Sequence, residues 1–194
     1  MHGQRFDLRI AGVGGQGVVG LSTLIARAAA RQGLSVSVID RPRSAMRLGP
    51  ITCDLRFGRP GSAAFITPGD ADAVLALEPL DGVMNAAWLL KKDGLLLLNA
   101  AETPTIEELV SGKRDARRDD WLDAVEQRGA TALRVDAAKQ AVDCGSDAES
   151  EGYFLLGVLC ASAKGFPVSP QAIREELAGQ TGRLTAFEGG LRRS

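Results

Sequence analysis

Hydrophobic positions along the chain switch between two spacings, and the switches predict alternating strands and helices. Phe6, Leu8 and Ile10 alternate with other residues and lead on to Val13, which predicts a buried first strand. The apolar residues that follow recur at helical spacing, and we expect Gly33 to end that helix. These helical positions are Leu21, Leu24, Ile25, Ala28 and Ala29.

A second short strand is predicted from Val36, Val38 and Ile39, and it ends at Asp40. A strand, a helix and a strand in this order predict a parallel unit with a right-handed crossover. A basic loop with two prolines, residues 41–50, follows the second strand.

Residues 51–57 alternate strictly between apolar and polar side chains. Thr52, Asp54 and Arg56 form the polar side of this pattern. Such alternation predicts a strand that runs antiparallel to its neighbours and keeps one face in water.

The second half of the chain continues the alternation of strands and helices. Residues 73–77 and 95–98 are apolar throughout and predict buried strands, and residues 132–135 predict another. Glu78 and Pro79 are expected to open a helix between the first two. The inner face predicted for that helix consists of Leu80, Val83, Met84, Ala87 and Leu90.

Helices dominate the predicted C-terminal end. The pattern predicts them over residues 120–127 and 153–164, and Ser169-Pro170 has the residue types that begin another. No linker or repeat divides the chain. We therefore expect one α/β domain over residues 1–194, with a three-layer α/β/α architecture. Its sheet should be Rossmann-like and mixed but mostly parallel, with a helical C-terminal end.

Composition narrows the classes of function. The 194 residues carry a net charge of -1 and 5% aromatic residues, so neither nucleic acid nor an anionic membrane is expected as a partner. No apolar run approaches the ~20 residues that span a bilayer, and the N-terminus lacks a signal-peptide pattern. We expect a cytoplasmic protein.

Metal and histidine chemistry are not expected in this chain. Cys53, Cys144 and Cys160 are far apart and form no C-x-x-C pair, so the sequence predicts free thiols and no metal site. The only histidine is His2, close to the terminus. We therefore assign no catalytic residue to the chain itself.

A glycine-rich loop is the strongest functional signal. Residues 12–17 read G-V-G-G-Q-G after a predicted strand and before a predicted helix. Glycines allow a phosphate to approach the backbone, and free N–H groups at the helix start point towards it. Asp40 follows at the end of the second strand, where dinucleotide-binding folds place an acid on the ribose.

Two interpretations of this loop remain open from the residues alone. The first is an NAD(P)-binding site in a free-standing reductase or redox-sensing module. Against it, Gln16 stands where an apolar residue is expected, and the chain has one tyrosine, no internal histidine and no second domain. The second is a tight turn that only packs a helix on a strand.

The whole chain resembles the gamma subunits, or gamma domains, of 2-oxoacid:ferredoxin oxidoreductases. The resemblance rests on G-V-G-G-Q-G-V-V, on residues 47–51, on the Glu78-Pro79 helix start and on the Lys-Lys-Asp-Gly turn before Leu95–Asn99. It continues through residues 154–157 and 186–190. Within the family the chain is most similar to the small subunits of indolepyruvate oxidoreductases.

This resemblance implies a division of labour between chains. Family members oxidise pyruvate, 2-oxoglutarate, branched 2-oxoacids or indolepyruvate to acyl-coenzyme A, with thiamine diphosphate and iron–sulfur clusters on other subunits and ferredoxin as acceptor. A large subunit would therefore be the partner, and the isolated chain would be inactive and prone to self-association. By resemblance, it covers the active-site cleft on the coenzyme A side. The cofactor-binding residues implied are Gly12, Gly14, Gly15, Gln16, Gly17, Arg47 and Gly49.

The sequence departs from the family pattern in two places. Residues 43–46 replace a Gly-Met-x-Gln run, and Leu48 replaces the first glycine of Arg-Gly-Gly. Glu151-Gly152-Tyr153 replaces an Asn-rich helix start. These changes suggest a divergent member that serves another 2-oxoacid or acceptor, and Leu48 also allows a non-enzymatic scaffold.

Overall fold

A single mixed sheet forms the centre of the computed structural model, which describes residues 5–42, 49–58, 65–100, 110–112 and 117–193. Its strands are β1 (Phe6–Val13), β2 (Val36–Pro42), β3 (Pro50–Phe57), β4 (Ala71–Ala76), β5 (Leu90–Asn99) and β6 (Thr131–Val135). The order across the sheet is β2-β3-β1-β4-β5-β6. Of these six strands, β3 runs opposite to the others, as the alternation over residues 51–57 predicts.

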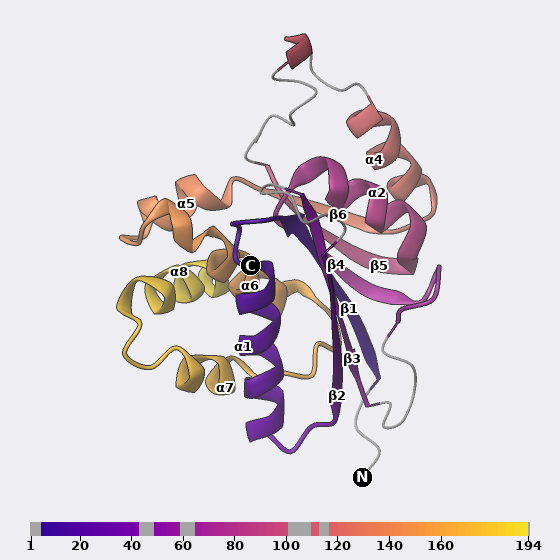
Figure 1. Cartoon of the computed structure of the whole chain (residues 1–194). Helices are drawn as coiled ribbons and strands as arrows, with labels where there is room; N and C mark the ends of the chain where they lie inside the picture. Colours follow the sequence, from indigo (N-terminus) through magenta and orange to yellow (C-terminus); the bar gives the residue numbers. More distant parts are fainter. Residues whose placement is uncertain (1–4, 43–48, 59–64, 101–109, 113–116, 194) are drawn as a thin grey trace.

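Helices cover both faces of the sheet and confirm the three-layer prediction (Figure 1). One face carries α2 (Pro79–Leu89) and α4 (Arg117–Gln127). The other carries α1 (Val18–Arg31), α5 (Ala137–Asp143), α6 (Glu151–Ser162), α7 (Pro170–Glu176) and α8 (Thr181–Arg192), with the short 3-10 turn η1 (Ala148–Ser150) before α6. None of the helices described is long and apolar enough to cross a bilayer.

The parallel unit predicted at the N-terminus has a strand inserted into it. β1 precedes α1 in the chain and β2 follows it, and the two strands run in the same direction. In the sheet, however, β3 lies between them and pairs with both. Asp40 therefore lies on an edge strand, two strands away from β1. At about 4.8 Å per strand, the inserted strand places β2 about 5 Å further from β1 than direct pairing of the two strands would.

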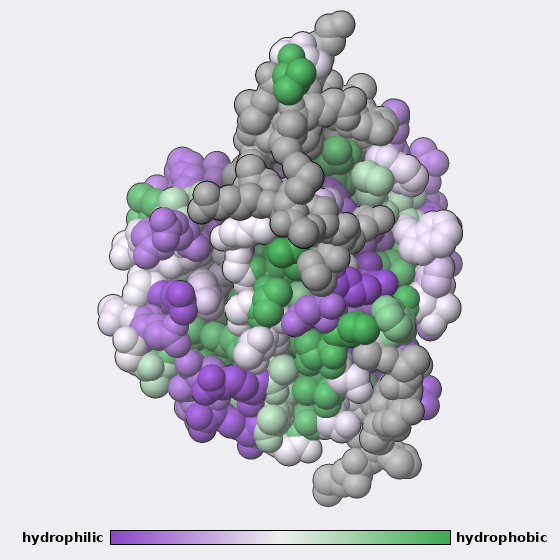
Figure 2. Space-filling view, in the orientation of Figure 1, coloured by the Kyte–Doolittle hydropathy of each residue, from purple (hydrophilic) through white to green (hydrophobic). Residues whose placement is uncertain are grey.

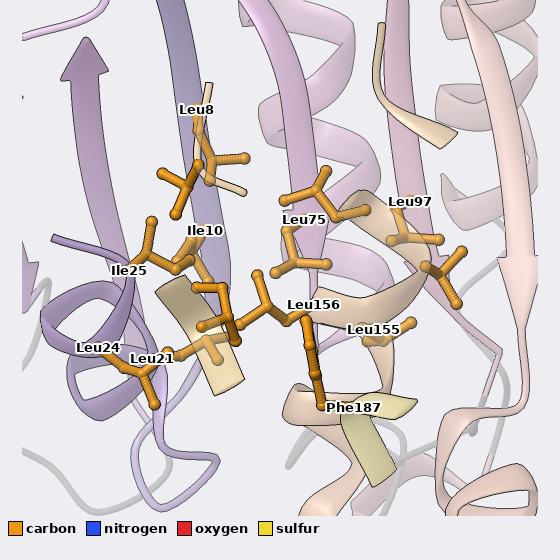
Figure 3. Packing of buried hydrophobic residues seen from close by; sticks show 14 of the residues in the cluster. Leu8, Ile10, Leu21, Leu24, Ile25, Leu75, Leu97, Leu155, Leu156 and Phe187 are labelled. Atoms are coloured by element: carbon orange, nitrogen blue, oxygen red, sulfur yellow. The ribbon is translucent and has the colours of Figure 1, made fainter. Parts of the chain in front are cut away.

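The larger core lies between the sheet and the five-helix layer. Alternate residues of β1 and β4 point towards α1 and α6, where Leu8, Ile10 and Leu75 meet Ile25 and Leu156 (Figure 3). A smaller core joins β4 and β5 to α2 and α4. Met84 was predicted on the inner face of α2, but its side chain is 41% exposed because the buried face is formed by neighbours such as Val83 and Ala86.

Glycines bring α6 and α8 into close contact. A Cβ atom on Gly157 would overlap the carbonyl oxygen of Phe187, and one on Gly190 would overlap the carbonyl oxygen of Phe154. The segments 154–157 and 186–190, which carry part of the family resemblance, therefore pack against each other across this crossing. Small residues are required because the two backbones nearly touch.

The polar face of β3 is buried, so the predicted wet face is wrong. Asp54 and Arg56 are 0% and 5% exposed, because each pairs with a charged residue directly opposite on β1. Arg56 makes a double hydrogen bond to Asp7, with both N–O distances at 3.0 Å. Arg9 binds Asp54 through Nε and through Nη2, the latter at 2.9 Å. Buried charges that are paired in this way are tolerated in a sheet.

Hydrophilic and hydrophobic residues gather on different parts of the molecular surface. Hydrophilic residues dominate the outer side of the five-helix layer, at the left of Figure 2, whereas hydrophobic residues gather over the middle of that view. There α1 lies beside the edge strand β2 (Figure 1), and Val19 and Val38 are exposed hydrophobic residues of these two elements.

Substitution of the crossing glycine tests the packing of α6 on α8. We expect Gly157→Ala to lower the free energy of unfolding by about 1–3 kcal/mol or more, because the added methyl overlaps backbone. Gly20→Ala in α1 is the matched control, since nothing lies within 4 Å of its added Cβ. It should raise stability by about 0.4–1 kcal/mol. Urea unfolding of both variants measures the difference, and similar small effects would contradict the close crossing.

Removal of a buried carboxylate tests the β1–β3 pairing. Asp54→Ala leaves the guanidinium of Arg9 buried and uncompensated, so we expect a loss of about 3–5 kcal/mol in urea unfolding. Asp143→Ala removes the exposed partner of Lys139 and should leave stability almost unchanged. A loss at Asp54 no larger than that at Asp143 would show that the pair does not hold the strands.

Candidate functional site

The glycine loop turns tightly between β1 and α1. Gly15 and Gly17 have φ angles of 104° and 76°, a region that other residues rarely adopt. At Gly12 a Cβ atom would lie 2.8 Å from Gln16 Oε1 and 2.8 Å from Val18 Cγ2, so only glycine fits. Gly14 N donates to the carbonyl oxygen of Gly49 at 3.0 Å, which places Gly49 beside the loop.

Gln16 holds the loop through both ends of its amide. Oε1 accepts a hydrogen bond from Val13 N at 2.9 Å, and Nε2 donates to the carbonyl oxygen of Leu77 at 3.3 Å. Leu77 follows β4, so Gln16 links the carboxyl ends of β1 and β4. Connections from these two strands diverge to opposite faces of the sheet, and open α/β sheets bind ligands at such a point. Gln16 positions the loop there.

The polar connection continues beyond Leu77. Asn99, the last residue of β5, donates through Nδ2 to the same carbonyl oxygen at 3.3 Å and to Glu151 Oε2 at 2.8 Å. Its Oδ1 accepts from Ala137 N at 3.3 Å. Asn99 and Glu151 therefore join the ends of β4 and β5 to the starts of α5 and α6. Neither was predicted as a site residue, although the position of Asn99 at a strand's carboxyl end was a usable signal.

Burial raises the pKa of the Glu151 carboxyl above its usual value. The hydrogen bond from Asn99 opposes that rise, and the nearby carboxylate of Asp136 adds to it. Glu151 is thus a partly desolvated acid beside the glycine loop.

Three helices begin at one hollow beside this connection. Its volume is about 960 Å³, and it is lined by the loop, by the start of α6 and by the start of α8. Gly17, Ser150 and Gln180, which precede α1, α6 and α8, provide no side-chain hydrogen bond to cap them. By contrast, side chains of Glu78, Asp136 and Ser169 cap α2, α5 and α7.

The uncapped helix starts suit an anionic ligand. The first N–H groups of a helix have no partner within it, and the helix dipole makes its start partly positive. Each exposed dipole contributes only about 0.3–1 kcal/mol, so direct N–H hydrogen bonds would provide most of the binding. The arrangement can therefore hold phosphate oxygens.

The hollow is lined by negatively and positively charged side chains. Asp147, Glu149 and Glu151 contribute carboxyl groups, whereas Arg183 contributes a guanidinium group. The Arg183 guanidinium lies 5.0 Å from the centre of the Tyr153 ring and donates to Gln180 Oε1 at 2.5 Å. A phosphate would therefore be favoured near the glycine loop and Arg183, away from the acidic side.

The remaining predicted residues fall into two groups. Gly12, Gly14, Gly15, Gln16, Gly17 and Gly49 are brought together around the loop. Arg47 lies outside the described residues, as do Leu48, residues 43–46 and His2.

The position of Asp40 argues against a dinucleotide site. Its Oδ1 accepts a hydrogen bond from Ser22 Oγ at 3.3 Å, and β3 separates its strand from β1. A ribose on the glycine loop would therefore lack the acid that the NAD fingerprint requires.

The thiols are free and separate. Burial raises the pKa of Cys53 to about 12, and it raises the pKa of Cys160 to about 12 as well. Within the described part of the chain, no group of three or more His, Cys, Asp or Glu residues is arranged to hold a metal ion.

The raised pKa of Glu151 predicts a pH-dependent effect on stability. Above that pKa, folding must bury a charged carboxyl, so the folded state is penalised relative to the unfolded state, where the value is near 4.5. We expect Glu151→Gln to raise the melting temperature at pH 7.5, and the gain should shrink as the pH falls through the raised pKa towards 4.5. Glu175→Gln on the exposed face of α7 is the control. A gain that persists unchanged at low pH would contradict the assignment.

Comparisons with known proteins agree with the fold. The sequence matches the family described as pyruvate ferredoxin/flavodoxin oxidoreductase over residues 7–188. It is 30% identical over 173 residues to indolepyruvate oxidoreductase subunit IorB of Thermococcus kodakarensis, covering 89% of this chain and 84% of the relative.

Two solved structures share the fold. The gamma subunit of a keto/oxoacid ferredoxin oxidoreductase from Geobacter sulfurreducens aligns with a TM-score of 0.67 at 20% identity, over 97% of each chain. The 2-oxoglutarate:ferredoxin oxidoreductase of Magnetococcus marinus, with 2-oxoglutarate, coenzyme A and succinyl-CoA bound, aligns with a TM-score of 0.69 at 18% identity. That match covers 97% of this chain but 31% of the other. With the family match, these findings show that the chain belongs to the pyruvate ferredoxin/flavodoxin oxidoreductase family.

Proposed function

We propose that the chain is the gamma-type subunit of a thiamine-diphosphate and iron–sulfur 2-oxoacid oxidoreductase, covering its active-site cleft and binding the phosphate end of coenzyme A. The observation that carries this proposal is the hollow at which three helices begin without side-chain caps beside the glycine loop. In the assembled enzyme, thiamine diphosphate would cleave the 2-oxoacid, the clusters would carry electrons to ferredoxin, and coenzyme A would take the acyl group.

The residues of this chain fit one part of that chemistry. Backbone N–H groups at the starts of α1 and α8 would bind phosphate oxygens, and Arg183 would leave the Tyr153 ring to add a charge-assisted hydrogen bond. Gln16 would fix the loop, so that its N–H groups are already oriented when the ligand arrives. Pre-ordering of this kind lowers the entropic cost of binding.

The same residues do not fit the other cofactors. Among the described residues, no group of three or more His, Cys, Asp or Glu side chains is placed to ligate a metal ion, and Cys53 is fully buried. We therefore assign the clusters and thiamine diphosphate to a large partner subunit, which leaves the isolated chain inactive. The Magnetococcus match supports this arrangement, because there a domain of this fold is part of a chain about three times as long.

The Gln16 amide tests the proposal in the assembled enzyme. We expect Gln16→Ala to raise the KM for coenzyme A on the order of tenfold, about 1.4 kcal/mol, because the loop loses both of its amide hydrogen bonds. Gln16→Glu should be worse, since it places a negative charge beside the phosphates. The KM for the 2-oxoacid should change little. Steady-state kinetics with a low-potential electron acceptor measures both constants.

Gln171→Ala provides a matched control for Gln16→Ala. Gln171 is exposed on α7, and its amide donates to Glu175. An unchanged KM for coenzyme A in Gln16→Ala, with turnover intact, would reject the binding role and favour a scaffold.

A further inference from the structure

A second hollow lies on the opposite face of the sheet, where β1 and β3 meet α2. Its volume is about 660 Å³, and its floor carries the side chains of Arg9, Arg41 and Thr52. Met84 and Trp88 of α2 form part of its wall. We call this feature the Arg41 hollow. The proposed coenzyme A site does not use it.

Three guanidinium groups share the buried cluster under this hollow. Arg56 pairs with Asp7. Asp54 serves both Arg9 and Arg41.

Among these three arginines, Arg41 is the one that reaches the surface and shares its carboxylate with other donors. Asp54 Oδ2 already accepts hydrogen bonds from Arg9 Nη2 at 2.9 Å and Ile66 N at 3.3 Å, besides the one from Arg41 Nη2 at 2.8 Å. Arg41 Nε is buried and has no hydrogen-bond acceptor within the described part of the chain. The guanidinium lies 5.0 Å from the centre of the Phe65 ring and is 35% exposed. A carboxylate from outside would bind the exposed part of this guanidinium and not the buried Nε.

The wall of the hollow is apolar and open. Met84 and Trp88 lie one helical turn apart, so both point from the same side of α2, and they are 41% and 67% exposed. Between them, Asn85 Oδ1 accepts a hydrogen bond from Arg9 Nη1 at 2.6 Å, which fixes α2 to the charged floor. Trp, Met and Arg are enriched where protein partners meet, and Trp and Arg often dominate the binding energy.

The Arg41 hollow lies near the sheet edge that carries the glycine loop. Arg41 is opposite Thr52, and Thr52 is opposite Ala11, the residue before Gly12. The Arg41 hollow and the glycine loop thus both lie near the carboxyl end of β1, but the hollow opens on one face of the sheet and the loop leads to the other. A large subunit that meets the loop at this edge would also reach the hollow.

We propose that the Arg41 hollow receives an acidic segment of the large partner subunit, whose carboxylate binds Arg41 and whose apolar side chain covers Met84 and Trp88. This interface rests on the proposed function, because that function supplies the partner. Charge complementarity and the shared edge favour an acidic protein segment over a second copy of this chain.

The test is the affinity between this chain and the large subunit that co-purifies with it, measured without oxygen by biolayer interferometry. We expect Trp88→Ala and Arg41→Gln each to raise Kd tenfold or more. Arg41→Gln should also flatten the salt dependence of Kd, and Arg41→Lys should restore part of the affinity. Circular dichroism melts check that each variant folds.

Two matched variants serve as controls. Trp121→Ala removes a half-exposed indole on α4 that does not line the hollow. Arg5→Gln removes an exposed cation just before β1, at the end of that strand opposite the glycine loop. Both should leave Kd within twofold of the wild-type value.

Each failure has a distinct meaning. If wild-type chain binds no large subunit, the proposed function fails and the interface fails with it. If wild-type chain binds but Trp88→Ala and Arg41→Gln bind equally well, the interface alone is wrong. If Trp88→Ala abolishes self-association of the isolated chain without changing the affinity for the large subunit, a second copy occupies the hollow and the proposal is overturned.

Discussion

Two buried guanidinium–carboxylate pairs between β1 and β3 are the interactions on which the rest of the structure depends. Asp7 lies opposite Arg56, and Arg9 lies opposite Asp54, so a shift of one residue would leave four buried charges unpaired. The pairs therefore fix both the register of these strands and the place of β3 beside β1. That placement moves β2 to the edge of the sheet and takes Asp40 away from the glycine loop.

The same constraint changes the meaning of the glycine motif. With Asp40 displaced, the loop keeps its phosphate-binding geometry but loses the ribose partner of a dinucleotide site. The α5–α8 layer lies beside the loop instead, and α6 and α8 begin there without side-chain caps. Gln16 and Asn99 connect these parts through the carbonyl oxygen of Leu77. This arrangement supports the proposal that the loop holds an anionic ligand other than a dinucleotide.

Periodicity predicted the elements well but could not predict what lies opposite each strand. It identified β3 as antiparallel, yet its polar residues are buried, because Asp7 and Arg9 look like minor interruptions in an apolar strand. The glycine loop and Gly49 were predictable from local motif and resemblance. The link from Asn99 to Glu151 joins residues 52 positions apart, so no local pattern reveals it. Met84 was misplaced because α2 packs through smaller neighbours, which leaves Met84 and Trp88 on the open side.

The central claim is that the hollow between the glycine loop and the starts of α6 and α8 binds coenzyme A in the assembled enzyme. Hydrogen exchange of the anaerobically purified complex, with and without coenzyme A, tests it most directly. The account predicts slower exchange at amides of residues 14–20, 150–154 and 181–184 when coenzyme A is added. Unchanged exchange at all three segments, under conditions where the complex turns over coenzyme A, would contradict it.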